Sequence, residues 1–215
     1  MEDNEKKKIS WQNIKCKYIL TQIFDNLKLI RLLNIIKYNK RLQNLYEKNI
    51  IDYKNEYYKI EIELIPSNKT YYHDKIINIY EESCHIYFDD NTEEIERNYV
   101  KTEDKISKIK VVLNLETDSL SELFLDCSII KKIKFIEFNN KNIKNMKSMF
   151  QNCKELIEID ISKLKTDNTT DMSGMFFNCS NLQELDLTNF NTTNTIDMSG
   201  MFMWMKSLKE LNTIN

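Results

Sequence analysis

Apolar residues in the second half of the chain recur every 26 positions. The pair Met–Phe stands at 149–150, 175–176 and 201–202, and a cysteine stands at 127, 153 and 179. Leucine or isoleucine keeps the same spacing at 156, 182 and 208, and at 159, 185 and 211. A weaker copy begins at Leu123. A unit of this length cannot bury its own apolar face, so we expect consecutive units to stack.

Each 26-residue unit divides into two halves with different periodicities. The series Leu182-x-x-Leu185-x-Leu187 alternates like a short strand. Met172, Met175, Phe176 and Cys179 follow the i, i+3, i+4, i+7 spacing of one helical face. We therefore predict parallel strands, with Ile159 paired in register with Leu185, and short helices between them. The strands are expected near residues 108–112, 131–135, 157–161, 183–187 and 209–212.

The repeat resembles a known family over residues 117–215. Its two best copies, 149–174 and 175–200, fit the series Met-Phe-x-x-Cys-x-x-Leu-x-x-Leu-x-Leu, with isoleucine at 159 and 161 in the first copy, followed downstream by Asp-Met-Ser. This series is similar to the BspA-type leucine-rich repeat. The resemblance implies an α/β fold, a leucine-rich-repeat-type solenoid of 26-residue units with parallel strands on one face and short helices on the other. A small helical segment and a short β region would precede it.

The amino-terminal segment shows two amphipathic helical patterns within residues 10–48. Such helices could cap the end of the repeat array. The segment is also similar to an F-box, because Ile-Leu-x-x-Ile-Phe-x-x-Leu at 19–27 is followed by Leu-Leu and later by Lys-Arg. That resemblance implies binding to a Skp-type adaptor of a cullin ubiquitin ligase. The residues that would bind the adaptor are Ile19, Leu20, Ile23, Phe24, Leu27, Leu32 and Leu33.

The chain is thus expected to comprise three regions. Residues 1–48 form the helical, F-box-like cap, residues 49–105 a small mixed α/β connection, and residues 106–215 the repeats. Short alternating stretches in the middle region, such as 59–65 and 85–88, predict strands. The last repeat is incomplete, so we expect an open edge after residue 212, belonging either to a fragment of a longer array or to an end that pairs with a second copy.

Residues that flank the inward apolar pair of each strand are expected to point outward. Their charge changes along the array, with lysines first and carboxylates later. This order is typical of a docking surface for another protein, although a solvated face without a partner would show the same alternation. The expected face comprises Lys108, Lys110, Lys132, Lys134, Glu158, Asp160, Ser162, Glu184, Asp186, Thr188 and Glu210.

Composition narrows the functional classes. Lys plus Arg is 31 and Asp plus Glu is 33, and this near-neutral balance argues against a nucleic-acid binder. We find no apolar run of the roughly 18 residues needed for a membrane helix and no secretory signal, which favours a cytoplasmic protein without membrane partners. The absence of alanine beside abundant Asn, Ile and Lys indicates an AT-rich genome.

Candidate chemistry is sparse. The chain holds only two glycines, which excludes most phosphate-binding loops, and it lacks the common catalytic motifs. An odd count of five cysteines argues against a disulfide framework. The 26-residue spacing of three of them favours small apolar residues in the core over a row of metal ligands. His73 and His85 near Cys84 are a weaker metal alternative. We therefore expect a non-enzymatic protein-interaction module without cofactor or metal, with an F-box-type substrate receptor as the alternative.

Overall fold

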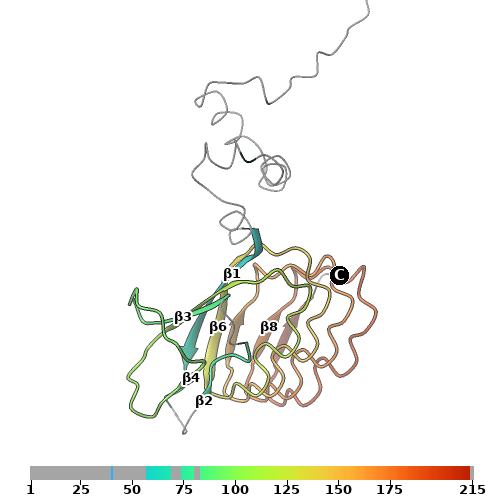
Figure 1. Ribbon diagram of the computed structural model, residues 1–215. Helices are drawn as coiled ribbons and strands as arrows, with labels where there is room; N and C mark the ends of the chain where they lie inside the picture. Colours follow the sequence, from blue (N-terminus) through green and yellow to red (C-terminus); the bar gives the residue numbers. More distant parts are fainter. Residues whose placement is uncertain (1–39, 41–56, 69–73, 80–82, 214–215) are drawn as a thin grey trace, which may run out of the picture. The chain divides into compact units, whose positions relative to one another are not determined.

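The computed structural model describes residues 40, 57–68, 74–79 and 83–213. The chain divides into two units, Met1–Tyr57 and Tyr58–Asn215, and the fold below is that of the second unit (Figure 1). Its strands are β1 (Lys59–Pro66), β2 (Asp74–Lys75), β3 (Cys84–Phe88), β4 (Tyr99–Val100), β5 (Ile109–Asn114), β6 (Ile130–Phe138), β7 (Glu158–Asp160), β8 (Glu184–Asp186) and β9 (Glu210–Asn212).

The largest sheet in the described residues is mixed and has the order β3-β5-β1-β6-β7. Strand β1 lies at its centre. Its burial alternates strictly, with Ile60, Ile62 and Leu64 fully buried and mainly charged residues on the other side. It runs antiparallel to both β5 and β6, while β7 runs parallel to β6. Figure 1 shows β1 lying between the β3 side of the sheet and the repeats.

The predicted uninterrupted parallel array is wrong, although a strand forms at each of the five expected places. Strand β5 is antiparallel to β1, and β1 separates it from β6. Strands β7 and β8 belong to different sheets within the described residues, so the expected pairing of Ile159 with Leu185 does not form. Parallel pairing joins β6 to β7 and β8 to β9.

The predicted helices of the repeats are also wrong, because residues 83–213 contain none. Four turn segments stand in their place, at 120–126, 146–152, 172–178 and 198–204. Every second N–H in the first three segments donates to a carbonyl of the following segment or of the residue just before it. Met172 N, for example, donates to Asp197 O at 2.8 Å. An α-helix needs these N–H groups for bonds to the carbonyl four residues earlier, so the lateral bonds exclude it.

Within each turn segment the remaining N–H groups close tight turns. Met175 N, for instance, donates to Met172 O at 3.2 Å. Two residues per segment take a left-handed backbone, and in the third segment these are Gly174 (φ 61°) and Asn178 (φ 57°), residue types that tolerate this conformation. The α/β solenoid expected from the sequence is therefore corrected to mixed sheets joined to stacked turn segments. The helical segment expected before it lies outside the described residues, apart from Lys40.

The core of the repeats is built from equivalent side chains of successive units. Phe124, Phe150, Phe176 and Phe202 form a column of near-parallel rings, with centroids 5.7, 5.4 and 6.4 Å apart in that order. The cysteines at 127, 153 and 179 are fully buried, as the small-core-residue interpretation predicted. The Cys153 thiol donates to Phe124 O at 3.1 Å, and its burial raises its pKa well above the ordinary value.

Candidate functional site

The outward side of strands β6 to β9 carries the face predicted from the sequence. Lys132 stands opposite Glu158 and Lys134 opposite Asp160 across the parallel β6–β7 pair. Each couple forms an ion pair, that of Lys134 with Asp160 at 3.4 Å. The basic and acidic residues of neighbouring units therefore neutralise one another here. Exposed pairs of this kind contribute little stability, about 0–1 kcal/mol each.

The two earlier lysines are separated from this part of the face. Lys110 lies on β5, with β1 between it and β6, and it forms an ion pair with Glu61 of β1 at 3.0 Å. Lys108 instead pairs with Asp90 at 2.8 Å. Burial by itself would raise the pKa of Glu61. The hydrogen bonds that Lys110 and Lys59 donate outweigh this effect, so the pKa of Glu61 lies below its ordinary value. The positive charges of the predicted basic half of the face are thus neutralised by carboxylates within the described residues.

Sequence reasoning missed the carboxylates of β1. Glu63 stands in register with Lys110 on one side and with Lys134 on the other. The alternation Lys59-Ile60-Glu61-Ile62-Glu63 does indicate a strand, but nothing in it tells which strands it joins. The insertion of β1 between β5 and β6 could therefore not be found from the repeat period.

Carboxylates without a cation partner in the described part of the chain gather on β8 and β9. Glu184 and Glu210 stand side by side in the parallel pair, and Asp186 stands beside Asn212. All of these side chains are exposed. Like charges opposite each other on a sheet repel. The face therefore ends in a local excess of negative charge.

Two predicted binding residues hold the aspartates in place instead of facing a partner freely. Asp160 accepts hydrogen bonds from the hydroxyl (2.7 Å) and N–H (3.1 Å) of Ser162. Asp186 accepts the same two bonds from Thr188, at 2.7 and 2.9 Å. The hydroxyl bonds are the main cause that lowers the pKa of both aspartates. Both carboxylates are therefore ionised at neutral pH, and their orientation is fixed before any ligand arrives.

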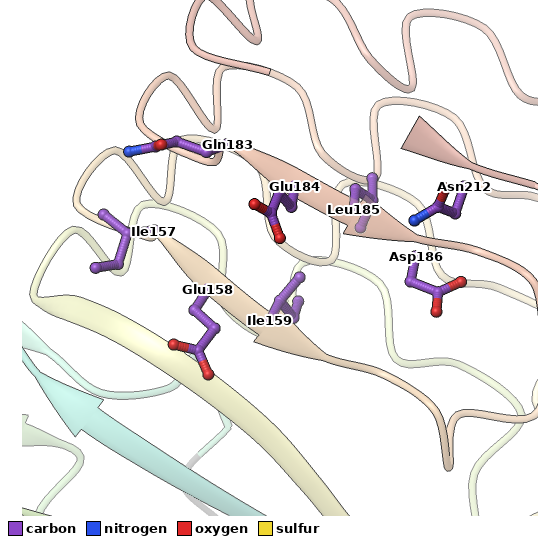
Figure 2. Close-up of a pocket in the computed structure, with 8 residues that line it drawn as sticks. All are labelled: Ile157, Glu158, Ile159, Gln183, Glu184, Leu185, Asp186 and Asn212. Carbon is purple, nitrogen blue, oxygen red and sulfur yellow. The ribbon is translucent and has the colours of Figure 1, made fainter. Parts of the chain in front are cut away.

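A groove of about 510 Å³ lies along the neighbouring strands β7 and β8. Figure 2 shows β7 along one side of it and β8 along the other. Its lining consists of Ile157, Glu158, Ile159, Gln183, Glu184, Leu185, Asp186 and Asn212. Ile157 N donates to Lys131 O, and Lys209 N donates to Gln183 O, but the equivalent bond from Gln183 N to Ile157 O is absent among the described residues. The surface of the groove is thus more polar than apolar, and it combines backbone groups that lack the bond found at the neighbouring strand pairs with the carboxylates of Glu158, Glu184 and Asp186.

The other predicted functional residues either lie outside the described residues or are not among those that line this groove. The seven residues assigned to adaptor binding, at positions 19–33, lie outside the described residues, as does His73. The His85 ring faces Glu94, with Nδ1 3.0 Å from Oε1. No group of three or more potential metal ligands occurs among the described side chains. The part of the chain that the structure describes also contains no helix long and apolar enough to cross a membrane.

Comparison with known protein families gives a match in the carboxy-terminal part of the chain. Residues 118–215 match a family described as Mycoplasma protein of unknown function, DUF285, which is related in general to BspA-like repeat families. The match covers the stacked turn segments and β6 to β9, and therefore the whole groove. Searches of curated proteins and of solved structures returned no match.

Proposed function

We propose that the protein binds other proteins through the outward face of β7, β8 and β9, and that its partners present basic, extended segments. The main support for this proposal is the groove at β7 and β8. Unpaired backbone groups lie there beside the carboxylates of Glu184 and Asp186, which have no cation partner among the described residues. An extended segment offers backbone donors and acceptors to such a groove. Lysine or arginine side chains on the segment would meet Glu184 and Asp186.

The charge of this face supports the proposal that the partner is basic. The lysines of β6 are occupied by Glu158 and Asp160, so the remaining charge on this face is acidic. Complementary rim charges mainly raise the association rate and make it dependent on salt. A basic partner should accordingly associate faster at low ionic strength, and an acidic one should not associate.

A charge-reversal experiment tests this function. The double variant Glu184→Lys/Asp186→Lys is compared with Glu96→Lys/Glu103→Lys, which makes the same change in net charge at exposed carboxylates outside the face. Binding is measured by fluorescence anisotropy with labelled peptides that alternate lysine or glutamate with isoleucine. We expect the face variant to weaken binding of the lysine peptide at least tenfold, about 1.4 kcal/mol, and the control to leave it nearly unchanged.

Equal weakening in both variants would show general charge attraction and would contradict a specific face. Equal binding of the lysine and glutamate peptides would contradict the proposed basic partner. The ubiquitin-ligase alternative has a separate test, because it requires co-purification with a Skp-type adaptor that is lost in Phe24→Ala. No contact among the described residues favours that alternative, so it stays a prediction from the sequence.

A further inference from the structure

Strand β1 lies between two strands that run parallel to each other. Both β5 and β6 are antiparallel to β1, and each pairs with it directly. Leu64 of β1 stands opposite Ile109 of β5 on one side and opposite Ile133 of β6 on the other. The residue two positions earlier, Ile62, shows the same match. The two neighbours of β1 therefore already share one direction and one register.

The turn segments that follow β5 and β6 contact each other directly. The four alternate N–H groups of segment 120–126 donate to carbonyls of residues 145–151 at 2.8–2.9 Å. The rings of Phe124 and Phe150 stack with their centroids 5.7 Å apart. On the sheet side β1 holds β5 and β6 roughly 9.6 Å apart, because neighbouring strands are about 4.8 Å apart. The two units are thus one spacing apart at the turns and two spacings apart at the strands.

The pairing of β1 with β6 is less regular than its pairing with β5. Six residue pairs join β1 to β5 in unbroken register. The pairing of β1 with β6 shifts register after Glu61 and again after Ile65. Each such shift disrupts the hydrogen-bond ladder locally, and Pro66 at the end of β1 has no N–H to donate. The side of β1 that faces β6 is therefore the side that opens more easily.

Ion pairs on the outward face tie β1 to both neighbours. Glu61 of β1 pairs with Lys110 of β5 at 3.0 Å. Lys59 of β1 pairs with Glu137 of β6 at 2.7 Å. Three apolar side chains on the other side of β1 are fully buried in the core. Charge and apolar burial together therefore hold β1 in the sheet.

Two lysines oppose direct contact between β5 and β6. Glu63 of β1 stands in register with Lys110 of β5 and with Lys134 of β6. Without β1 between them the two lysines would stand opposite each other, and like charges in that position repel. The inserted arrangement of β1 is therefore favoured in the free chain, and part of this preference depends on charge.

From this geometry we propose that β1 is a releasable strand and that β5 pairs directly with β6 when β1 leaves. The two strands have the common direction that parallel pairing needs, as in the pair β6–β7. Release removes Glu61 and Glu63 from the sheet and leaves Lys110 without its ion pair, so the outward face becomes more basic. Residues 1–57 precede β1 in the chain. A partner that binds them more tightly in the released state shifts the equilibrium toward release.

Hydrogen exchange tests whether β1 leaves a sheet that otherwise stays folded. A central strand normally exchanges slowly, through global unfolding. We expect the amides of Ile62 and Leu64 to exchange at least tenfold faster than those of Met146 and Phe150, which bond to the next turn segment. Exchange in β1 should also depend less on urea than exchange at Phe150, because local release exposes less surface than global unfolding.

Charge variants test what holds β1 in place. Lys110→Gln/Lys134→Gln removes the ion pair with Glu61 and the repulsion between the two lysines, so exchange in β1 should become at least threefold faster. The control Lys154→Gln/Lys163→Gln makes the same change in net charge at exposed lysines outside the sheet. This control should leave exchange in β1 nearly unchanged.

A disulfide can trap the released state. The variant Lys110→Cys/Lys134→Cys is made with Cys16→Ser, since the four other native cysteines are buried. Two cysteines cannot bond when their Cα atoms are more than about 7 Å apart, so β1 must leave before this disulfide forms. We expect mild oxidation to form it and to remove the protection of the β1 amides, while Phe150 stays protected. Lys132→Cys/Glu158→Cys, at facing positions of β6 and β7, is the positive control.

Several results would overturn the proposal. Exchange in β1 that is as slow and as urea-dependent as exchange at Phe150 would show that β1 leaves only by global unfolding. Formation of the control disulfide without that of Lys110→Cys/Lys134→Cys would show that β5 and β6 do not meet. Loss of protection at Phe150 in the trapped chain would show that the disulfide formed in an unfolded chain. Equal acceleration by both lysine variants would contradict the role of Lys110 and Lys134.

Discussion

The phenylalanine column allows one substitution to be compared at two positions of different packing. Phe176 is fully buried and stacks on a ring at each side, with centroids 5.4 and 6.4 Å away. Phe202 is partly buried and stacks on Phe176 alone in the described residues. Removing a buried phenylalanine side chain costs about 3–5 kcal/mol, and each ring–ring contact contributes about 0.5–1.5 kcal/mol of that.

We therefore expect Phe176→Ala to lower the free energy of unfolding by about 4 kcal/mol and Phe202→Ala by about 2 kcal/mol. Urea denaturation followed by circular dichroism measures both. With a slope of roughly 2 kcal/mol per molar urea for a unit of this size, the midpoints should fall by about 2 M and about 1 M. Phe176→Leu, which keeps more apolar volume, should lose less than Phe176→Ala.

Equal losses at the two positions would refute the reasoning, because the difference in ring contacts would then have no energetic consequence. A change of slope would instead show that the variant had altered the cooperative unit, so that the midpoints no longer report one free energy. A larger loss at Phe202 than at Phe176 would mean that the outer face of the Phe202 ring is covered in solution.

Three further predictions concern the backbone, the thiols and the pH response. Gly174→Ala should destabilise more than Gly200→Ala in thermal melts, because both have positive φ but the added Cβ at 174 meets Ser148 Oγ at 3.3 Å, whereas at 200 nothing lies within 4 Å. The burial-raised thiol pKa of Cys153 should make its alkylation follow global unfolding, and fast labelling of native protein would contradict that. Thr188→Ala removes the hydroxyl hydrogen bond that lowers the pKa of Asp186. The variant should therefore be less stable than the native chain above about pH 4, and the difference should vanish as the pH falls through the lowered pKa of Asp186. A loss of stability that does not change with pH would contradict this.

The sequence predicted the places of the repeat strands better than their arrangement. The 26-residue period locates β6 to β9 because the same core positions recur in every unit. The i, i+3, i+4, i+7 spacing of Met172, Met175, Phe176 and Cys179 predicted a helix, yet these side chains are buried in a turn segment instead. Burial periodicity reports which side chains face the core, and it cannot show whether an N–H bonds within its own segment or to the next one.

The sequence predicted which side chains of β6 to β9 point outward, but not which of their charges form ion pairs. The outward positions of β6 to β9 follow directly from strand alternation, and the structure places Glu184 and Asp186 beside the groove. The order from lysines to carboxylates is present in the structure, but Glu61 of β1 and Glu158 and Asp160 of β7 form ion pairs with lysines of the face. Those pairings depend on which strands become neighbours, and for β1 that information lies outside the repeat.

The common direction of the bonds between turn segments has a mechanical consequence. A force that pulls the stack apart along that direction loads all the bonds of one interface together, and interfaces then open one after another. Each unit that opens would release about 90 Å of chain, since an extended residue spans roughly 3.5 Å. The boundary between β7 and β8 lacks sheet pairing, so the first rupture under tension should occur there.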